Sequence, residues 1–298
     1  MTLRIAMIGL GNMGGPMAAN AVKAGHRVKG FDLVAVSRAA AAAHGVLVVH
    51  SAAEAIADAE AIITMLPNAA IVRTVWTELG PVLPAGALAI DCSTIDVGSA
   101  KAFHALAARH GLLSVDAPVS GGVAGAAAGT LTFMCGGEAA ALDAADPVLA
   151  AMGRTIVRCG PAGAGQAAKI CNNMILGVSM IAVCEAFALA DRLGLDRQAM
   201  FDVVSASSGA CWAINTYCPV PGVGPKSPAD NDYQPGFTAA LMLKDLRLAA
   251  EAAGEVGAPA ALGRHAAELY EAFVAAGNGA KDFSAIMLAL SAGKAGEA

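Results

Sequence analysis

The chain is poor in aromatic and charged residues. Of its 298 residues, 4% are aromatic and 14% are charged, whereas roughly 25% are charged in an average soluble protein. It contains no run of more than two Lys or Arg residues, and its formal net charge is −5. Because nucleic-acid binding needs a clustered basic face, we expect no nucleic-acid partner. Hydrophobic residues, many of them alanine, make up 56% of the chain, which excludes an intrinsically disordered protein.

Long hydrophobic runs and paired cysteines are also missing. The longest apolar run, Met174–Cys184, falls short of the roughly 20 residues that cross a bilayer, so we expect no membrane span. The seven cysteines contain no C-x-x-C pair, which favours reduced thiols over a disulfide framework and predicts no metal site. No signal or transit segment precedes the strand-like run that begins near Met1, so we expect a soluble, cytoplasmic protein.

The hydrophobic pattern changes near residue 163. Before that point, short β-like runs alternate with alanine-rich helical segments, which is typical of a parallel sheet covered on both faces. The expected strands are Ile5–Ile8, Arg27–Phe31, Val46–Val49, Ala61–Met65, Ala87–Ile90, Leu113–Val115, Thr130–Cys135 and Thr155–Arg158. The remainder is helical and starts with one long helix over Gln166–Leu193. Asp196 is expected to cap the next helix, and Cys218–Phe237 to form a long loop.

A glycine-rich string, Gly9-Leu10-Gly11-Asn12-Met13-Gly14, follows the first expected strand and opens a helix. In this G-x-G-x-x-G pattern, the glycines permit a tight turn and a close approach of the backbone to a dinucleotide pyrophosphate. Asp32 closes the second strand, where a carboxylate accepts hydrogen bonds from ribose hydroxyls and repels a 2′-phosphate. The pattern predicts an NAD site, and the alternative for Asp32 is an ordinary turn residue.

The pattern and the motif together predict an α/β fold. We expect a Rossmann-type, doubly wound parallel sheet in residues 1–163, which binds the dinucleotide. An all-α C-terminal domain in residues 164–298 follows, joined through the long helix and serving substrate binding and oligomerisation. Its apolar faces exceed what one chain readily covers, so we expect a homo-oligomer, either a dimer or a tetramer.

Lys169 is the candidate for moving a substrate proton. It lies near the start of the long helix, with Asn173 one turn further on the same face and Asn172 beside it. Buried ammonium and amide groups need partners, so the alternative to catalysis is a structural salt bridge. The six histidines lie in helix or turn contexts and show no carboxylate partner or metal-ligand spacing, so we expect none of them to be catalytic.

A second glycine-rich string, Asp116–Gly122, follows another expected strand. The Ser120 hydroxyl and the backbone N–H groups of Gly121 and Gly122 can bind a carboxylate, although the string can equally be an ordinary turn. Residues 125–129, which begin and end with glycine, are expected to form a loop of small residues.

In this order, the three strings resemble the β-hydroxyacid dehydrogenase family, and the match runs from Leu3 to about Ser284. The resemblance implies NAD-dependent oxidation of a small carboxylic acid, in particular of 3-hydroxyisobutyrate to methylmalonate semialdehyde in valine breakdown. It implies that Lys169 relays the hydroxyl proton. The implied substrate-binding residues are Ser120, Gly121, Gly122, Asn172 and Asn173.

The resemblance also implies contacts to NAD beyond the glycine string. They come from the loops after the fourth and fifth strands and from the string Lys244-Asp245. The full implied set is Gly9, Gly11, Asn12, Met13, Gly14, Asp32, Leu66, Pro67, Thr94 and Lys244. Two alternatives stay open. One is a dehydrogenase or reductase of another short acid, such as 3-hydroxypropionate, serine or glyoxylate; the other is a non-catalytic dinucleotide sensor.

Overall fold

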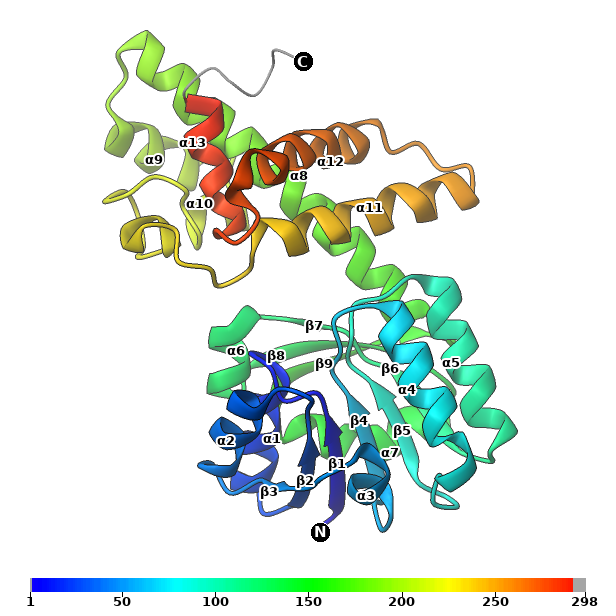
Figure 1. The fold of residues 1–298 in the computed structure, drawn as a ribbon. Coiled ribbons are helices and arrows are strands. Elements are labelled where there is room, and N and C mark those ends of the chain that lie inside the picture. The colour runs from blue at the N-terminus through cyan, green and yellow to red at the C-terminus, as the bar shows by residue number, and fades with distance from the viewer. Residues whose placement is uncertain (1, 292–298) are drawn as a thin grey trace. The chain divides into compact units, whose positions relative to one another are not determined.

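The computed structural model describes residues 2–291 (Figure 1). Contacts within the chain divide it into two compact units, Met1–Lys169 and Ile170–Ala298. The boundary expected between residues 163 and 164 coincides with the start of helix α8 (Ala164–Leu193), whose first turns belong to the first unit. The division into domains 1–163 and 164–298 stays a prediction.

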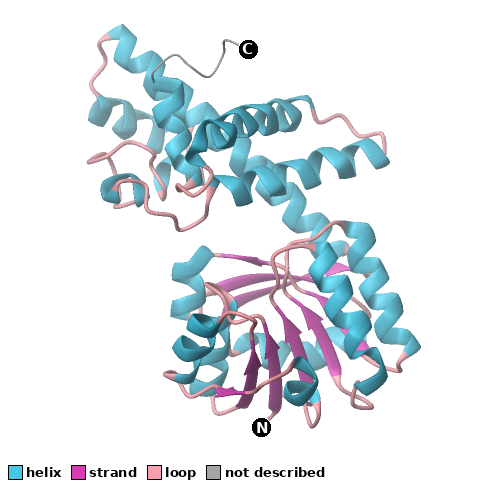
Figure 2. Ribbon diagram, viewed as in Figure 1, coloured by secondary structure: helices cyan, strands magenta, loops and turns pink. Residues whose placement is uncertain are grey.

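Within the described residues, the first unit is built on a nine-stranded sheet (Figure 2). Its strands are β1 Arg4–Ile8, β2 Arg27–Phe31, β3 Leu47–Val48, β4 Ala61–Thr64, β5 Leu88–Asp91, β6 Leu113–Asp116, β7 Val119–Ser120, β8 Leu131–Gly136 and β9 Gly153–Gly160. The order is β3-β2-β1-β4-β5-β6-β8-β7, with β9 paired to β8. Strands β1 to β6 pair in parallel, whereas β8 runs antiparallel to β6 and β7. The doubly wound, mainly parallel sheet is confirmed.

Helices cover both faces of this sheet. They are α1 Gly14–Lys23, α2 Ala35–Ala42, α3 Ala52–Ile56, α4 Ala69–Leu79, α5 Val97–Arg109, α6 Gly122–Ala128 and α7 Ala139–Ala150. Successive strand residues point to opposite faces. Accordingly, Ile5 and Met7 pack in one buried cluster with α1 and α7, whereas Ala6 and Ile8 pack in another with α3, α4 and α5.

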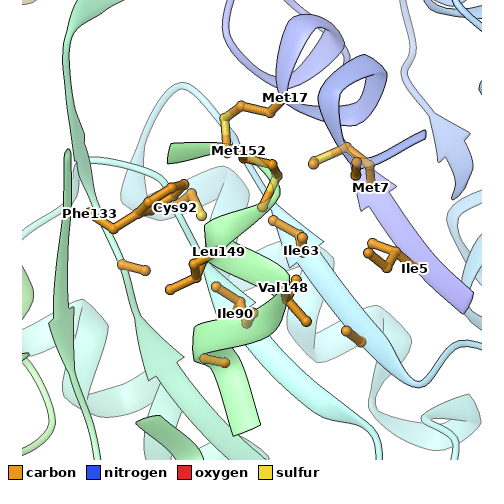
Figure 3. Packing of buried hydrophobic residues seen from close by; sticks show 14 of the residues in the cluster. Ile5, Met7, Met17, Ile63, Ile90, Cys92, Phe133, Val148, Leu149 and Met152 are labelled. Atoms are coloured by element: carbon orange, nitrogen blue, oxygen red, sulfur yellow. The ribbon is translucent and has the colours of Figure 1, made fainter. Parts of the chain in front are cut away.

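The cluster on the α7 side shows why the sheet needs continuous apolar runs (Figure 3). Val148 and Leu149 of α7 lie over Ile63 of β4 and Ile90 of β5, and all four are at most 1% exposed. Strands covered in this way on both faces have no polar side to present to water. The short hydrophobic runs in the sequence therefore predicted them well.

The prediction that residues 125–129 form a loop of small residues is wrong. Residues 122–128 form helix α6, and the preceding Val119–Ser120 pairs with β8 as the short strand β7. Alanines favour the helix, and Gly129 ends it in the left-handed conformation at φ 65°. Glycine frequency alone suggested a loop, but Gly122 begins the helix, Gly125 lies inside it and Gly129 ends it.

The second unit is helical, as predicted. After α8 it contains α9 Arg197–Ser205, α10 Trp212–Asn215, α11 Ala239–Glu255, α12 Ala261–Phe273 and α13 Ile286–Ser291. The Asp196 carboxylate accepts a hydrogen bond from the Ala199 N–H at 3.0 Å, which confirms the expected cap of α9. The expected long loop contains a short 3₁₀ helix, Pro228–Asn231, and packs the buried ring of Tyr233 into the core.

Helix α8 bears on the expectation that the chain has no membrane span. It is 30 residues long, and its most apolar 18-residue window has a mean hydropathy of 1.8, which meets the length and composition criteria for a span. One such helix is weak evidence, because the core helix of a globular protein meets the same criteria. Met180, Cys184 and Phe187 are fully buried among the helices of the second unit, so we assign α8 as a core helix.

Candidate functional site

The three glycines of the first motif meet different requirements. Gly9 has φ +95°, and a Cβ atom there would collide with the carbonyl oxygen of Met65. A Cβ atom at Gly14 would collide with the carbonyl oxygen of Gly9, whereas one at Gly11 would meet no atom within 4 Å. The loop is therefore closed on its inner side and open at Gly11.

The open side of this loop fits a dinucleotide pyrophosphate. Asn12 and Met13 lie in the turn, and α1 begins with neither a side-chain cap at Met13 nor an acidic residue in its first turn. The N–H groups at the start of a helix attract an anion when no side chain satisfies them. The space at Gly11 lets phosphate oxygens approach the backbone, which a side chain there would prevent.

Asp32 follows β2 and holds the glycine loop. Its two carboxylate oxygens accept hydrogen bonds at 2.7 Å from the N–H groups of Leu10 and Val34. Asp32 is thus a turn residue, and its oxygens keep lone pairs that ribose hydroxyls can use. Arg38 donates to the carbonyl oxygens of Asp32 and Leu33 at 2.6 and 2.9 Å, so its guanidinium is already engaged beside this carboxylate.

Leu66, Pro67 and Thr94 lie in the loops that follow β4 and β5. Because β1, β4 and β5 are parallel neighbours, these loops emerge at the same sheet edge as the glycine turn. The Leu66 N–H donates to the Ser93 hydroxyl at 2.9 Å and links the two loops. Strand order reverses between β1 and β4, and dinucleotides bind at such a switch point.

Asp91, at the end of β5, is a buried carboxyl group that the sequence did not reveal. Its Oδ1 accepts hydrogen bonds at 2.7 Å from the hydroxyls of Thr64 and Ser93, while its Oδ2 has no hydrogen-bond partner within residues 2–291. Burial raises the pKa of Asp91 to about 6, against the opposing effect of these hydrogen bonds. Through the Ser93 hydroxyl, which also accepts from the Leu66 N–H, the Asp91 carboxyl group supports the loops after β4 and β5.

Ser120, Gly121 and Gly122 form the connection between β7 and α6. Gly121 and Gly122 have φ values of +127° and +60°, which favour glycine because it has no Cβ atom. The string is therefore a strand-to-helix turn. That it binds a carboxylate stays a prediction.

Lys169 and Asn173 are buried on one face of α8, with 8% and 2% of their surface exposed. Asn172 is exposed, which corrects the expectation that all three polar groups are buried. Its amide donates to Asn173 Oδ1 at 2.9 Å.

In the second unit, the asparagines connect to the predicted cofactor residue Lys244. The Asn173 amide donates to Oδ2 of the buried Asp245, whose Oδ1 lies 3.2 Å from the Lys244 ammonium. Asp245 thus pairs with both Lys244 and Asn173. The roles assigned to these residues stay predictions.

The expectation that no histidine has a carboxylate partner is wrong. His104 Nε2 lies 2.8 Å from Asp116 Oδ1, and its Nδ1 lies 2.8 Å from the Ser114 hydroxyl. His265 pairs with Glu268 on the surface. The i, i+2 spacing of Ser114 and Asp116 on a strand places both side chains on the same face of the sheet. This spacing could have indicated that they share a partner on a helix packed against that face.

The described part of the chain contains no group of three or more His, Cys, Asp or Glu side chains that could hold a metal ion. All seven cysteines are free. A glycine turn at the switch point, a helix start without a side-chain cap and an acid after β2 together define a dinucleotide-binding Rossmann domain.

Comparison with known proteins gives the family. Residues 4–160 match the family described as the NAD binding domain of 6-phosphogluconate dehydrogenase. Residues 163–290 match the family described as NAD-binding of NADP-dependent 3-hydroxyisobutyrate dehydrogenase. The solved structure of the Mycobacterium tuberculosis 3-hydroxyisobutyrate dehydrogenase with L-serine is 54% identical, with a TM-score of 0.93, covering 97% of this chain and 99% of that one.

Two Pseudomonas aeruginosa proteins are also similar. A 3-hydroxyisobutyrate dehydrogenase is 48% identical, over 89% of this chain and 90% of that protein. An NAD-dependent L-serine dehydrogenase is 46% identical, over 95% and 96%. The chain belongs to the 3-hydroxyisobutyrate dehydrogenase family and is an NAD-dependent oxidoreductase, which confirms the predicted family, enzyme class and cofactor.

Proposed function

We propose that the chain oxidises 3-hydroxyisobutyrate to methylmalonate semialdehyde, a step of valine breakdown. The observation that carries this proposal is the buried Lys169, one helical turn from the buried Asn173, in a chain of this family. An ammonium at that position is held by surrounding structure, which is what a proton-transferring group needs.

Each predicted site residue has a defined part in the proposed reaction. The glycine loop Gly9–Gly14 and Asp32 would hold NAD, which would supply the acceptor for a hydride from the C3 carbon. As the neutral amine, Lys169 accepts a hydrogen bond from the C3 hydroxyl and takes up its proton. The O–H and C–H bonds break, the C–O bond becomes C=O, and the lysine becomes an ammonium. Ser120, with the N–H groups of Gly121 and Gly122, binds the substrate carboxylate, and Asn173 assists from the turn after Lys169. Asn172 holds the Asn173 amide, and Lys244 contributes to cofactor binding.

We further propose that NAD is preferred to NADP. The Asp32 carboxylate accepts two backbone hydrogen bonds and stays at the ribose end of the site, where it would repel a 2′-phosphate. Arg38, the cation next to it, already uses Nη1 to donate to the carbonyl oxygens of Asp32 and Leu33.

Serine is the second candidate substrate, because one relative is a serine dehydrogenase and another relative's structure contains L-serine. Both acids carry a primary hydroxyl on C3 and differ at C2, where one has a methyl group and the other an ammonium. We expect kcat/KM to be highest for 3-hydroxyisobutyrate among 3-hydroxyisobutyrate, serine, 3-hydroxypropionate and glyoxylate, each measured with both cofactors. A higher value for serine would reassign the substrate, and NAD binding without turnover of any acid would indicate a sensor.

The test of the lysine is Lys169→Ala, with the exposed Lys23→Ala as a matched control. General acid–base catalysis contributes roughly 10²- to 10⁴-fold, so kcat should fall by that factor while the Kd for NAD stays close to wild type. Lys23→Ala should leave both values unchanged. Wild-type turnover in Lys169→Ala would remove this residue from the mechanism.

We also propose a cytoplasmic homo-oligomer, either a dimer or a tetramer. Three large apolar side chains on α8, Ile175, Leu189 and Leu193, are 58–74% exposed and follow one side of the helix. Seven free thiols are typical of a reducing compartment. Size-exclusion chromatography with light scattering tests the assembly, and a monomer at micromolar concentration would contradict it.

A further inference from the structure

Gln166 is a buried amide in the first turn of α8, three residues before Lys169. It is 0% exposed, and both ends of its side chain are used. Its Nε2 donates to the carbonyl oxygen of Ser93 at 2.7 Å, and its Oε1 accepts from the N–H of Ile95 at 3.1 Å. These two residues flank Thr94, the predicted cofactor contact after β5, so one side chain holds the backbone on both sides of it.

The backbone of the same helical turn is held as well. The Asp116 carboxylate accepts hydrogen bonds from the N–H groups of Gln166 at 3.0 Å and Gly163 at 2.9 Å. Gly165 packs against strand ends so closely that a Cβ atom there would collide with the carbonyl oxygen of Met134. The start of α8 is therefore fixed against β5, β6 and β8, and its direction is set before the chain reaches Lys169.

We propose that Gln166 is a positioning residue of the reaction: its amide fixes the first turn of α8 to the peptide groups around Thr94 and thereby sets the position of the Lys169 ammonium. The inference rests on the proposed function of Lys169. The partners of Gln166 support it, because they belong to a loop at the cofactor edge of the sheet rather than to the apolar core. An amide of this length supplies one donor and one acceptor, which neither glutamate when ionised nor methionine can do.

A double-mutant cycle tests the proposal. Gln166→Met keeps the size of the side chain and removes both hydrogen bonds. A displacement of the lysine by a fraction of an ångström should lower kcat roughly 10- to 100-fold, with the Kd for NAD changed less than about threefold. In the Lys169→Ala background, the same change should cost less than about twofold, because there is no ammonium left to misplace. The exposed Gln198→Met is the matched control and should leave kcat unchanged.

The outcomes separate this inference from the function on which it rests. If Gln166→Met lowers kcat by the same factor with and without Lys169, the residue acts on the fold alone and the inference is wrong. If Gln166→Met leaves kcat at the wild-type value, the inference is wrong as well. If Lys169→Ala alone retains full turnover, the proposed function fails and the inference fails with it.

A second variant covers the case in which Gln166→Met does not fold. Gln166→Glu keeps the acceptor for Ile95 and, when protonated, still donates to the Ser93 carbonyl oxygen. Ionised, it places a carboxylate oxygen against that carbonyl. We expect its kcat relative to wild type to fall as the pH rises from about 6 to about 9.5. A ratio that does not change with pH over this range overturns the proposal.

Discussion

Several glycines of the first unit pack against backbone atoms, whereas those described glycines of the second unit that have a neighbour within 4 Å pack against side chains. Cβ atoms at Gly9, Gly14 and Gly165 would collide with the carbonyl oxygens of Met65, Gly9 and Met134. A Cβ atom at Gly177 would instead lie 2.9 Å from Leu246 Cδ2, and one at Gly263 would lie 2.8 Å from Met174 Sδ. A carbonyl oxygen cannot move without its strand, but the end of a leucine or methionine side chain can rotate away.

The difference follows from what each unit has to bind or pack. A pyrophosphate held by backbone N–H groups needs a backbone that stays in place, and contact between peptide groups provides that rigidity. In the second unit, Met180 and Phe187 of α8 pack with side chains such as Met242 of α11, and these side chains can adjust to one another. The comparison predicts that small changes in the first unit are costly and that similar changes in the second unit are tolerated.

Gly14→Ala should have the largest effect on stability. The added methyl group collides with the Gly9 carbonyl oxygen, so the glycine loop must shift as a whole. We expect a loss of about 3 kcal/mol or more, seen as a fall in Tm of about 10 °C, together with loss of NAD binding. Gly254→Ala on α11, where a Cβ atom meets nothing within 4 Å, is the control and should keep its Tm. Equal Tm values for the two variants would contradict the comparison.

Two buried carboxylates, Asp91 in the first unit and Asp245 in the second, have different partners. In the first unit, Asp91 accepts hydrogen bonds from the neutral groups of Thr64 and Ser93. In the second, Asp245 lies 3.2 Å from the ammonium of Lys244. A carboxylate without a cation is stabilised less when it is ionised, which is consistent with the raised pKa of Asp91.

Asp91→Asn should therefore stabilise the protein relative to wild type as the pH rises. The pKa of Asp91 is raised from 3.8 to about 6, so the folded protein holds a proton that the unfolded chain releases between these pH values. The contribution of Asp91 to wild-type stability falls across this range by roughly 3 kcal/mol, whereas the asparagine at this position does not titrate. The measurement is the difference in Tm between variant and wild type from about pH 4 to pH 7.

Asp58→Asn is a control for which the Tm difference from wild type should change with pH in the opposite direction. The hydrogen bond from the Lys29 ammonium holds the pKa of this surface carboxyl below its ordinary value. Its contribution to stability is present when the pH is above that ordinary value, and it is lost as the pH falls. The Tm of the variant relative to wild type therefore falls slightly as the pH rises. A Tm difference for Asp91→Asn that stays flat or falls with pH would show that burial does not control this group.

The sequence predicted the parts of the site that depend on residues close together in the chain. The glycine turn after β1 and the acid after β2 are local patterns, because each needs only a strand end and the loop that follows it. The sequence also predicted the main strands of the sheet. Both faces of the sheet are covered, so these strands are continuous apolar runs.

What the sequence did not predict depends on pairs of distant residues. Gln166 meets Ile95 across 71 positions, and its partners are peptide groups that carry no residue signature. His104 finds Asp116 only because α5 packs next to β6. In the loop after the fifth strand, the sequence predicted a cofactor contact from Thr94 but not the buried carboxyl group of Asp91. Burial of a carboxylate at a strand end is visible only when the neighbouring strands are in place.

Gly11→Ala separates the binding role of the glycine loop from its packing role. A Cβ atom at Gly11 meets no protein atom within 4 Å, so the fold should be unaffected and the Tm should stay within about 2 °C of wild type. The methyl group enters the space assigned to the pyrophosphate, so we expect the Kd for NAD to rise about tenfold or more. Fluorescence titration with NADH measures it. Unchanged affinity would mean that the cofactor does not approach the loop at this residue.

Gly177→Ala should have the smallest effect and tests the second unit. A methyl group there meets Leu246 Cδ2 at 2.9 Å and Met242 Sδ at 3.1 Å, and both atoms lie at the ends of flexible side chains. Alanine also favours the interior of α8 by up to roughly 1 kcal/mol over glycine, which offsets the cost of moving these neighbours. We expect a Tm within about 3 °C of wild type and unchanged NAD affinity. A loss as large as that of Gly14→Ala would show that side-chain packing around α8 is as unyielding as the backbone contacts of the first unit.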